Sequence, residues 1–259
     1  MHFDVILPSV LFFIITGSMF LQRKLEKRIA SLLEEKKLSM REVALTVAWM
    51  GVAVTAVVFI PSEAIQILFL AAYSYMLFSF TYVALKKWYI AVFPSILFLL
   101  SYFFYWNLIV FDIFVIIFSM IIIVYASGLF SWKTVWIFAI LLTIMDIIQV
   151  FVTGFMGQSA TKMIELKLPV LLMIPTYPSG LTVGLGMGDL FLAGLLSIHT
   201  AAKRGTKAGI LTATTNSLAM FIFEAALLNT MFARFFPATL VVIAGTIAGL
   251  GAMHFIKLD

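Results

Sequence analysis

Long apolar runs separated by short polar connectors dominate the chain and predict a helical membrane protein. A helix needs about 20 mostly apolar residues to cross a bilayer. Nine runs approach this length, namely Phe3–Leu21, Val43–Ile60, Ala64–Leu85, Ile90–Tyr105, Leu108–Phe130, Thr134–Phe155, Leu181–Ser197, Ala208–Leu228 and Pro237–Phe255. The runs lack the alternation of apolar and polar residues that is typical of a membrane β-barrel. Lipid offers no hydrogen-bond partners, so the backbone groups of these runs must bond each other within helices. We therefore predict an all-α, polytopic membrane protein of nine transmembrane helices, forming a single domain over residues 1–259.

Composition agrees with this pattern and excludes a soluble protein. Apolar residues make up 63% of the chain and charged residues 11%, with a mean hydropathy of +1.14. Soluble domains have roughly 45–50% apolar and about 25% charged residues. Membrane lipid is therefore the first predicted partner. The first run is predicted to be a retained span, because no basic segment precedes it and no small-residue cleavage site follows it.

Lysine and arginine are distributed unevenly between the two sets of connectors. With nine spans, 14 basic residues fall on the side of the first connector and three on the other. The larger set is Arg23, Lys24, Lys27, Arg28, Lys36, Lys37, Arg41, Lys86, Lys87, Lys133, Lys203, Arg204, Lys207 and Lys257; the smaller is Lys162, Lys167 and Arg234. Because basic loops stay in the cytoplasm, we predict a cell-membrane protein with its N-terminus outside and its C-terminus in the cytoplasm. The net charge of +5 then reflects orientation, and no nucleic-acid partner is expected.

Two connectors are long enough to contain structure of their own. Gln22–Glu42 is highly charged and is predicted to be a solvated connector, with a short surface helix as the alternative. Gly157–Gly180 opens with polar residues and continues with the apolar octet Leu168–Pro175. Eight residues are too few to span a bilayer as a helix. The octet, which contains two prolines, is therefore predicted to be an extended or interfacial segment that leads into the seventh span.

Four acidic residues fall inside the predicted spans. A charge near the bilayer centre costs at least about 2.5–3.5 kcal/mol on insertion scales, so each acid requires a reason. Asp112 and Glu224 lie near the outer ends of their spans, where snorkelling or pairing (of Glu224 with Arg234) accounts for them. Asp146 and Asp189 remain to be explained.

Asp146 shares a helical face with small and polar residues. At about 100° per residue, Gln149, Thr153 and Gly157 fall on the same side of the sixth predicted span. The stripe predicts that this face contacts protein or water. A hydrogen-bonded anchor between two helices is the structural alternative.

Asp189 follows three glycines, Gly184, Gly186 and Gly188. Glycine lets helices approach closely and loosens the local helix, although a simple packing face would also use it. A phosphate loop is rejected because no strand or Walker lysine accompanies the glycines. Asp146 and Asp189 lie on successive antiparallel spans and can meet at similar depth. Two such carboxyl groups share one proton, so that one activates water while the other binds the scissile carbonyl of a peptide.

The order of these residues resembles the presenilin and signal peptide peptidase family. An aspartate in the sixth span, Gly186-Met187-Gly188-Asp189 in the seventh and Pro237-Ala238 opening the ninth are similar to the family's three signatures. The nine spans and the octet also match, so the resemblance covers essentially the whole chain. The chain is most similar to a compact prokaryotic member of the family, of archaeal type. Two positions differ: Met145 stands where the family has Tyr, and Thr239 where it has Leu.

This resemblance implies an intramembrane aspartyl protease that cuts single-span transmembrane helices or remnant signal peptides, with Asp146 and Asp189 as the catalytic pair. It also implies a set of motif and substrate-binding residues, namely Gly186, Met187, Gly188, Pro237, Ala238, Leu168, Pro169, Val170 and Leu171. The segment before the seventh span would pair with the unwound substrate as a strand. The outside N-terminus is similar to that of signal peptide peptidases and implies substrates whose N-terminus is cytoplasmic. No cofactor is expected, and the absence of Cys and the scatter of three His argue against a metal site.

Two other functional classes stay open. A secondary transporter would use the two aspartates to carry protons or a cation, although the chain shows no internal symmetry of two halves. A non-catalytic scaffold is favoured by the differences at Met145 and Thr239. Adjacent aspartates would favour the protease, and separated acids along a pore would favour transport. The sequence does not define the natural substrate, its cleavage position or the oligomeric state, and a homo-oligomer is among the assemblies it allows.

Overall fold

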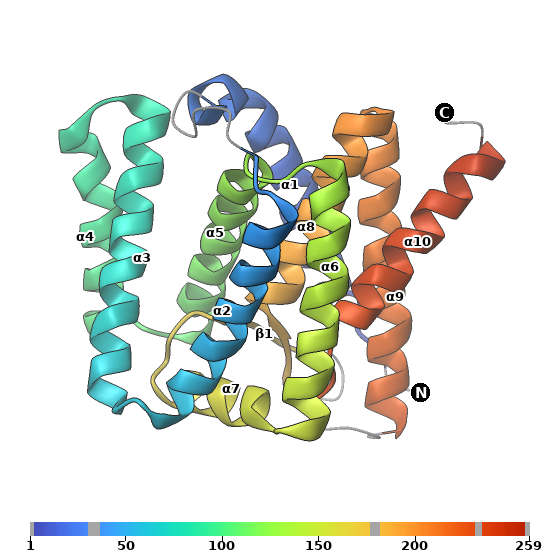
Figure 1. Ribbon diagram of the computed structural model, residues 1–259. Helices are drawn as coiled ribbons and strands as arrows, with labels where there is room; N and C mark the ends of the chain where they lie inside the picture. Colours follow the sequence, from blue (N-terminus) through green and yellow to red (C-terminus); the bar gives the residue numbers. More distant parts are fainter. Residues whose placement is uncertain (1–2, 31–36, 177–181, 231–234, 257–259) are drawn as a thin grey trace.

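Helices dominate the described part of the chain, and a single two-stranded hairpin interrupts them (Figure 1). The computed structural model describes residues 3–30, 37–176, 182–230 and 235–256. The helices are α1 Ile6–Ala30, α2 Met40–Phe59, α3 Ser62–Leu85, α4 Trp88–Phe104, α5 Leu108–Ser127, α6 Trp132–Ile147, α7 Phe155–Glu165, α8 Met187–Arg204, α9 Thr206–Thr230 and α10 Thr239–Ile256. A π-helical segment, η1 Ile148–Val152, continues α6. The strands β1 Leu171–Pro175 and β2 Thr182–Gly186 pair antiparallel, with Leu171 opposite Gly186.

Six of the described helices are long and apolar enough to cross a membrane: α1, α2, α3, α5, α6 with η1, and α9. Helices α4 and α10 are apolar but shorter. Large hydrophobic side chains such as Phe13, Trp49 and Phe103 are exposed on the surface of the bundle. An apolar surface of this extent is typical of contact with lipid. The chain is therefore a polytopic membrane-embedded protein.

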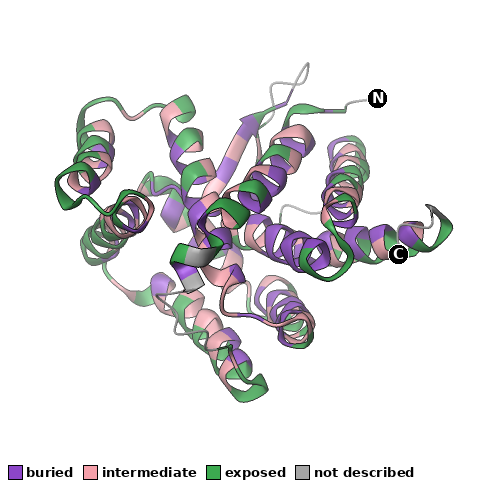
Figure 2. Cartoon of the chain, turned by 90° about the horizontal axis from the view of Figure 1, so that it is seen from above, coloured by how far each residue is buried: buried purple, intermediate pink, exposed green. Residues whose placement is uncertain are grey.

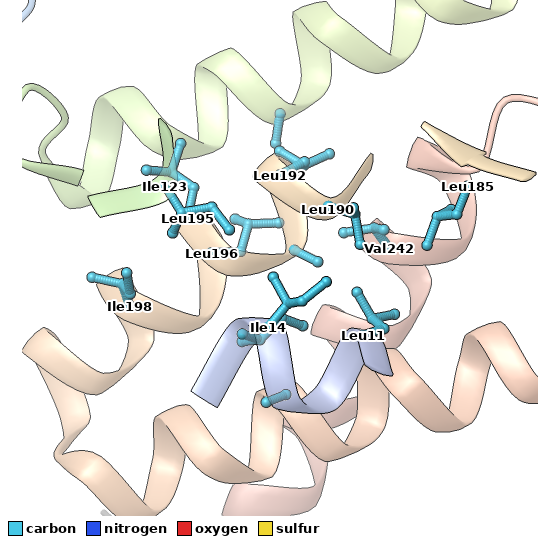
Figure 3. Packing of buried hydrophobic residues seen from close by; sticks show 14 of the residues in the cluster. Leu11, Ile14, Ile123, Leu185, Leu190, Leu192, Leu195, Leu196, Ile198 and Val242 are labelled. Atoms are coloured by element: carbon cyan, nitrogen blue, oxygen red, sulfur yellow. The ribbon is translucent and has the colours of Figure 1, made fainter. Parts of the chain in front are cut away.

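Helix α8 lies at the centre of the bundle. It contacts α1, α5, α6, α9 and α10, and every residue from Leu190 to Ala201 except Phe191 is buried. Figure 3 shows leucines of α8 packed against Leu11 and Ile14 of α1 and Val242 of α10. Seen from above, buried residues gather in the middle and exposed residues face outwards (Figure 2). A helix that is buried on all sides is a rigid support, and Asp189 lies in its first turn.

The predicted spans match the observed helices closely except at three places, of which the first is the seventh span. The sequence predicts this span from Leu181, which lies outside the described residues. Thr182–Gly186 form β2, and the helix begins only at Met187. Glycine is a poor helix former, and the two glycines of β2 make the extended conformation competitive. The prediction of an extended octet is confirmed, because β1 occupies its second half.

The second difference is at the end of the sixth span. The sequence predicts one helix from Thr134 to Phe155, but α6 gives way to η1, and the chain then turns at Gly154 into α7. Gly154 has a φ of +68°, which glycine adopts without strain. The predicted stripe is therefore wrong beyond Gln149: Thr153 is exposed, and Gly157 belongs to α7.

The third difference is in the charged connector after the first span, which is partly helical. Helix α1 continues to Ala30, and Ser39 begins α2 with a capping box in which its hydroxyl and the Glu42 carboxylate bond each other's backbone N–H groups. Residues 31–36 lie outside the described ranges. The connectors α3–α4 and α5–α6 lie at one end of the bundle, and α7 lies at the opposite end (Figure 1). Lys162 of α7 donates to the carbonyl oxygens of Val58 and Ile60 at 3.2 and 2.5 Å, which fixes α7 to the end of α2.

Candidate active site

Asp146 lies in the last regular turn of α6, and its side chain is only 6% exposed. The Thr239 hydroxyl, at the first residue of α10, donates a hydrogen bond of 2.9 Å to Asp146 Oδ2. Thr239 is itself 2% exposed. A buried carboxyl group needs such partners, because lipid and apolar side chains offer none. The contact also fixes the start of α10 against α6.

Asp189 lies in the first turn of α8, directly after β2, and is half-buried. The backbone of Gly186 donates a hydrogen bond to its carboxyl group. A Cβ atom on Gly186 would lie 3.1 Å from Asp189 Oδ2, so a larger residue there would press on the carboxyl group. The carboxyl groups of Asp189 and Asp146 are close enough to interact electrostatically. The structure thus brings together the two acids that the sequence singled out.

Two cavities meet at this pair of aspartates. The larger, of about 600 Å³, lies among α2, α3, α6, α7 and the hairpin and is almost entirely apolar apart from the acids. The smaller, of about 140 Å³, lies among α1, α9, the hairpin and residues 235–238. Asp146, Asp189, Leu171 and Gly186 border both cavities. The two carboxyl groups therefore lie where a larger apolar space meets a smaller one.

Aromatic side chains of α3 and α4, and one just after α4, hold the segment that precedes β1. Tyr73 donates to the carbonyl oxygen of Pro169 at 3.2 Å, and Tyr102 to that of Leu166 at 2.8 Å. The indole N–H of Trp106 donates to the carbonyl oxygen of Lys167 at 2.9 Å. These bonds satisfy carbonyl groups that neither a helix nor the hairpin uses.

The hairpin itself is tied to α5 and α8. The backbone N–H of Met173 donates to Asp112 Oδ1 at 2.8 Å, and the N–H of Met187 donates to the carbonyl oxygen of Val170 at 3.0 Å. Asp112, which the sequence places at an interface as a paired or snorkelling acid, is thus a support for β1. Its bond also explains why an acid occurs near the start of an apolar helix.

The remaining predicted site residues divide into those that border the cavities and those that lie behind them. Val170, Leu171, Met187 and Gly188 line the larger cavity, and Ala238 lines the smaller. The other three, Leu168, Pro169 and Pro237, are buried and border neither cavity. They act as packing residues that hold the lining segments in place.

The differences from the family's signatures occupy defined positions. Met145 packs against α2, where a Cβ atom on Gly51 would lie 2.6 Å from its Sδ atom. Gln149 of η1 donates to the carbonyl oxygen of Gly51 at 2.8 Å. Sequence reasoning treated Thr239 only as a difference and missed its contact with Asp146. A hydroxyl at the start of the ninth span, directly after Pro237-Ala238, was the available signal.

No protein-family model matches the chain, and no curated protein matches it. Function is therefore inferred from the chemistry of the two aspartates. Adjacent carboxyl groups can share a proton, hold a water molecule between them and move protons to and from a bound carbonyl or amide. They border a cavity of about 600 Å³ that is mostly apolar, which suits an apolar segment better than a polar small molecule.

Proposed function

We propose that the protein is an intramembrane aspartyl protease that hydrolyses peptide bonds in single-span transmembrane helices or remnant signal peptides. The observation that carries the proposal is the apposition of Asp146 and Asp189 at the junction of two cavities inside the helical bundle. Helices α1 to α6 and α8 to α10 would be the nine spans, and α7 would lie at the outer interface.

The reaction needs only the two aspartates and one water molecule. The ionised carboxyl group takes a proton from water while the oxygen of that water attacks the scissile carbonyl carbon. The protonated carboxyl group donates its proton to the carbonyl oxygen, giving a neutral gem-diol. The carboxyl group that took the proton from water then gives it to the amide nitrogen, while the other carboxylate takes a proton from a gem-diol hydroxyl. The C–N bond breaks, a carboxylic acid and an amine are released, and both aspartates return to their starting protonation. Thr239 and the Gly186 backbone would hold the two carboxyl groups in place.

The larger cavity would receive the substrate segment. A peptide bond in a helix is shielded by its own hydrogen bonds, so the substrate has to unwind before the acids reach it. An unwound strand needs new partners in a medium without water. The hairpin borders this cavity at Leu171 and Gly186 and would be the element to which the unwound substrate adds as a strand.

Transport is supported less well by this arrangement. A relay would place acids one after another along a path through the membrane. Asp146 and Asp189 instead interact electrostatically with each other from two helices in contact, and they border the same two cavities. A scaffold would have no need for two acids that border apolar cavities in which no described lining residue is basic. The geometry therefore favours hydrolysis.

Cleavage of a labelled single-span peptide by the purified full-length protein in detergent tests this proposal. Asp146→Asn and Asp189→Asn should each lower the rate by about 10²–10⁴-fold, because each removes a proton-transfer group. Glu63→Gln, at an exposed acid in the first turn of α3, should cut at the wild-type rate. Full activity in either aspartate variant, or an inert wild type across substrates of both orientations, would overturn the proposal. Proton or cation uptake by vesicles would then be measured.

A further inference from the structure

A third buried acid lines the smaller cavity. Glu224 of α9 is 1% exposed, and neither of its carboxyl oxygens has a hydrogen-bond partner among the described residues. It interacts electrostatically with another acid, Asp4, which is 3% exposed and accepts a hydrogen bond from the N–H of Leu7 at the start of α1. Arg234, the predicted partner of Glu224, lies outside the described residues. A carboxyl group in this position is costly unless a donor or cation reaches it.

The smaller cavity has the size of one amino-acid side chain. Its volume of about 140 Å³ is close to that of a protein cavity of about 150 Å³ that accepts benzene. Asp146 and Asp189 lie at its junction with the larger cavity, and Glu224 lies on its wall. A substrate held in the larger cavity with its scissile bond at the aspartates can therefore extend one neighbouring side chain towards Glu224.

The wall of the cavity indicates what that side chain is. Leu7, Met220 and Leu227 offer apolar contact, and Phe223 and Phe236 add aromatic rings. Lys and Arg combine an apolar stem with a cationic head and bind both surfaces. A metal ion fits less well, because no group of three or more His, Cys, Asp or Glu side chains in the described ranges could hold one.

We propose that the smaller cavity is a specificity pocket for a lysine or arginine next to the scissile bond, with Glu224 as the residue that selects it. The inference rests on the proposed function and adds a substrate class to it. A basic residue in the substrate's membrane segment is poorly solvated by lipid. When the basic side chain moves from lipid into this pocket, the Glu224 carboxylate replaces lipid as its surroundings. The exchange favours the bound substrate over the free transmembrane helix.

The test uses the purified full-length protein and a set of single-span peptides that differ at one position. Lysine is placed in turn at each of the three positions on either side of the cut and compared with norleucine, which keeps the stem and lacks the charge. At one position the wild type should cut the lysine peptide about tenfold faster or more, as expected for a buried charge pair. Glu224→Gln should bring the lysine-to-norleucine ratio close to one. Glu224→Lys should favour a glutamate peptide over the lysine peptide. Glu165→Gln, at an exposed acid on α7 that borders neither cavity, should keep the wild-type ratio.

Each result decides between the two proposals. A wild type that shows no lysine preference at any position overturns the pocket without recourse to any variant. A lysine preference that survives in Glu224→Gln also overturns the pocket. In either case the proposed protease activity still stands if the Asp146→Asn variant is inactive. A wild type that cuts none of the peptides overturns the protease and the pocket together.

Discussion

At the scale of single residues, the hydroxyl of Thr239 is the most testable support of the candidate site. Its bond of 2.9 Å to Asp146 Oδ2 is buried, and hydrogen bonds to charged groups contribute about 1.5–3 kcal/mol. Thr239→Val keeps the shape and removes the donor, so we expect peptide cleavage to fall by roughly ten- to a hundredfold. Thr239→Ser restores the donor and should restore most of the rate.

Thermal unfolding of the same variants shows whether a slower variant is simply less stable. A lower cleavage rate at an unchanged unfolding temperature means that the hydroxyl positions Asp146. If Thr239→Val cuts at the wild-type rate, the hydroxyl does not position Asp146. If the serine variant is as slow as the valine variant, the methyl group rather than the hydroxyl is what matters.

The two aspartates could be predicted from the sequence, whereas their partners could not. Asp146 and Asp189 stand out because an acid in an apolar span has few explanations. The contact of Thr239 with Asp146 joins residues 93 positions apart and depends on how α10 packs against α6. The sequence places Glu224 only near the end of a span, because the packing of α9 is what brings this residue to the smaller cavity.

At the scale of elements, the hairpin depends on a side chain of α5. The Asp112 carboxylate accepts the N–H of Met173 in the middle of β1, and a typical intramolecular hydrogen bond contributes about 0.5–1.5 kcal/mol. Asp112→Ala should raise amide hydrogen exchange across Leu171–Pro175 and slow peptide cleavage by about threefold to tenfold. Asp112→Asn keeps an acceptor oxygen and should resemble the wild type. Unchanged exchange in the alanine variant would show that β2 alone orders β1.

The elements themselves were predictable to different degrees. The long helices follow from apolar runs, since a membrane span has to be apolar along its whole length. The octet was recognised as extended from its length and prolines. Its partner β2 was not, because Thr182–Gly186 continue directly into α8 and look like part of one span. Helix α7 was missed because it is short and mixes polar with apolar residues, which a search for spans overlooks.

At the scale of the whole molecule, the protein's orientation would decide which orientation of substrate the proposed protease accepts. The α3–α4 connector, which carries Lys86 and Lys87, and the start of α6, which carries Lys133, lie at one end of the bundle (Figure 1). Basic ends of spans stay in the cytoplasm. The chain contains no cysteine, so a single introduced cysteine reports its position without background. Glu63→Cys, in the first turn of α3 next to the α2–α3 connector, should react with a membrane-impermeant maleimide in intact cells. Lys87→Cys, between α3 and α4, should react only after the membrane is permeabilised. The reverse labelling pattern would place the N-terminus in the cytoplasm, and substrates with an outside N-terminus would then become the preferred class. Labelling of both positions in intact cells would contradict the alternation of spans on which either orientation depends.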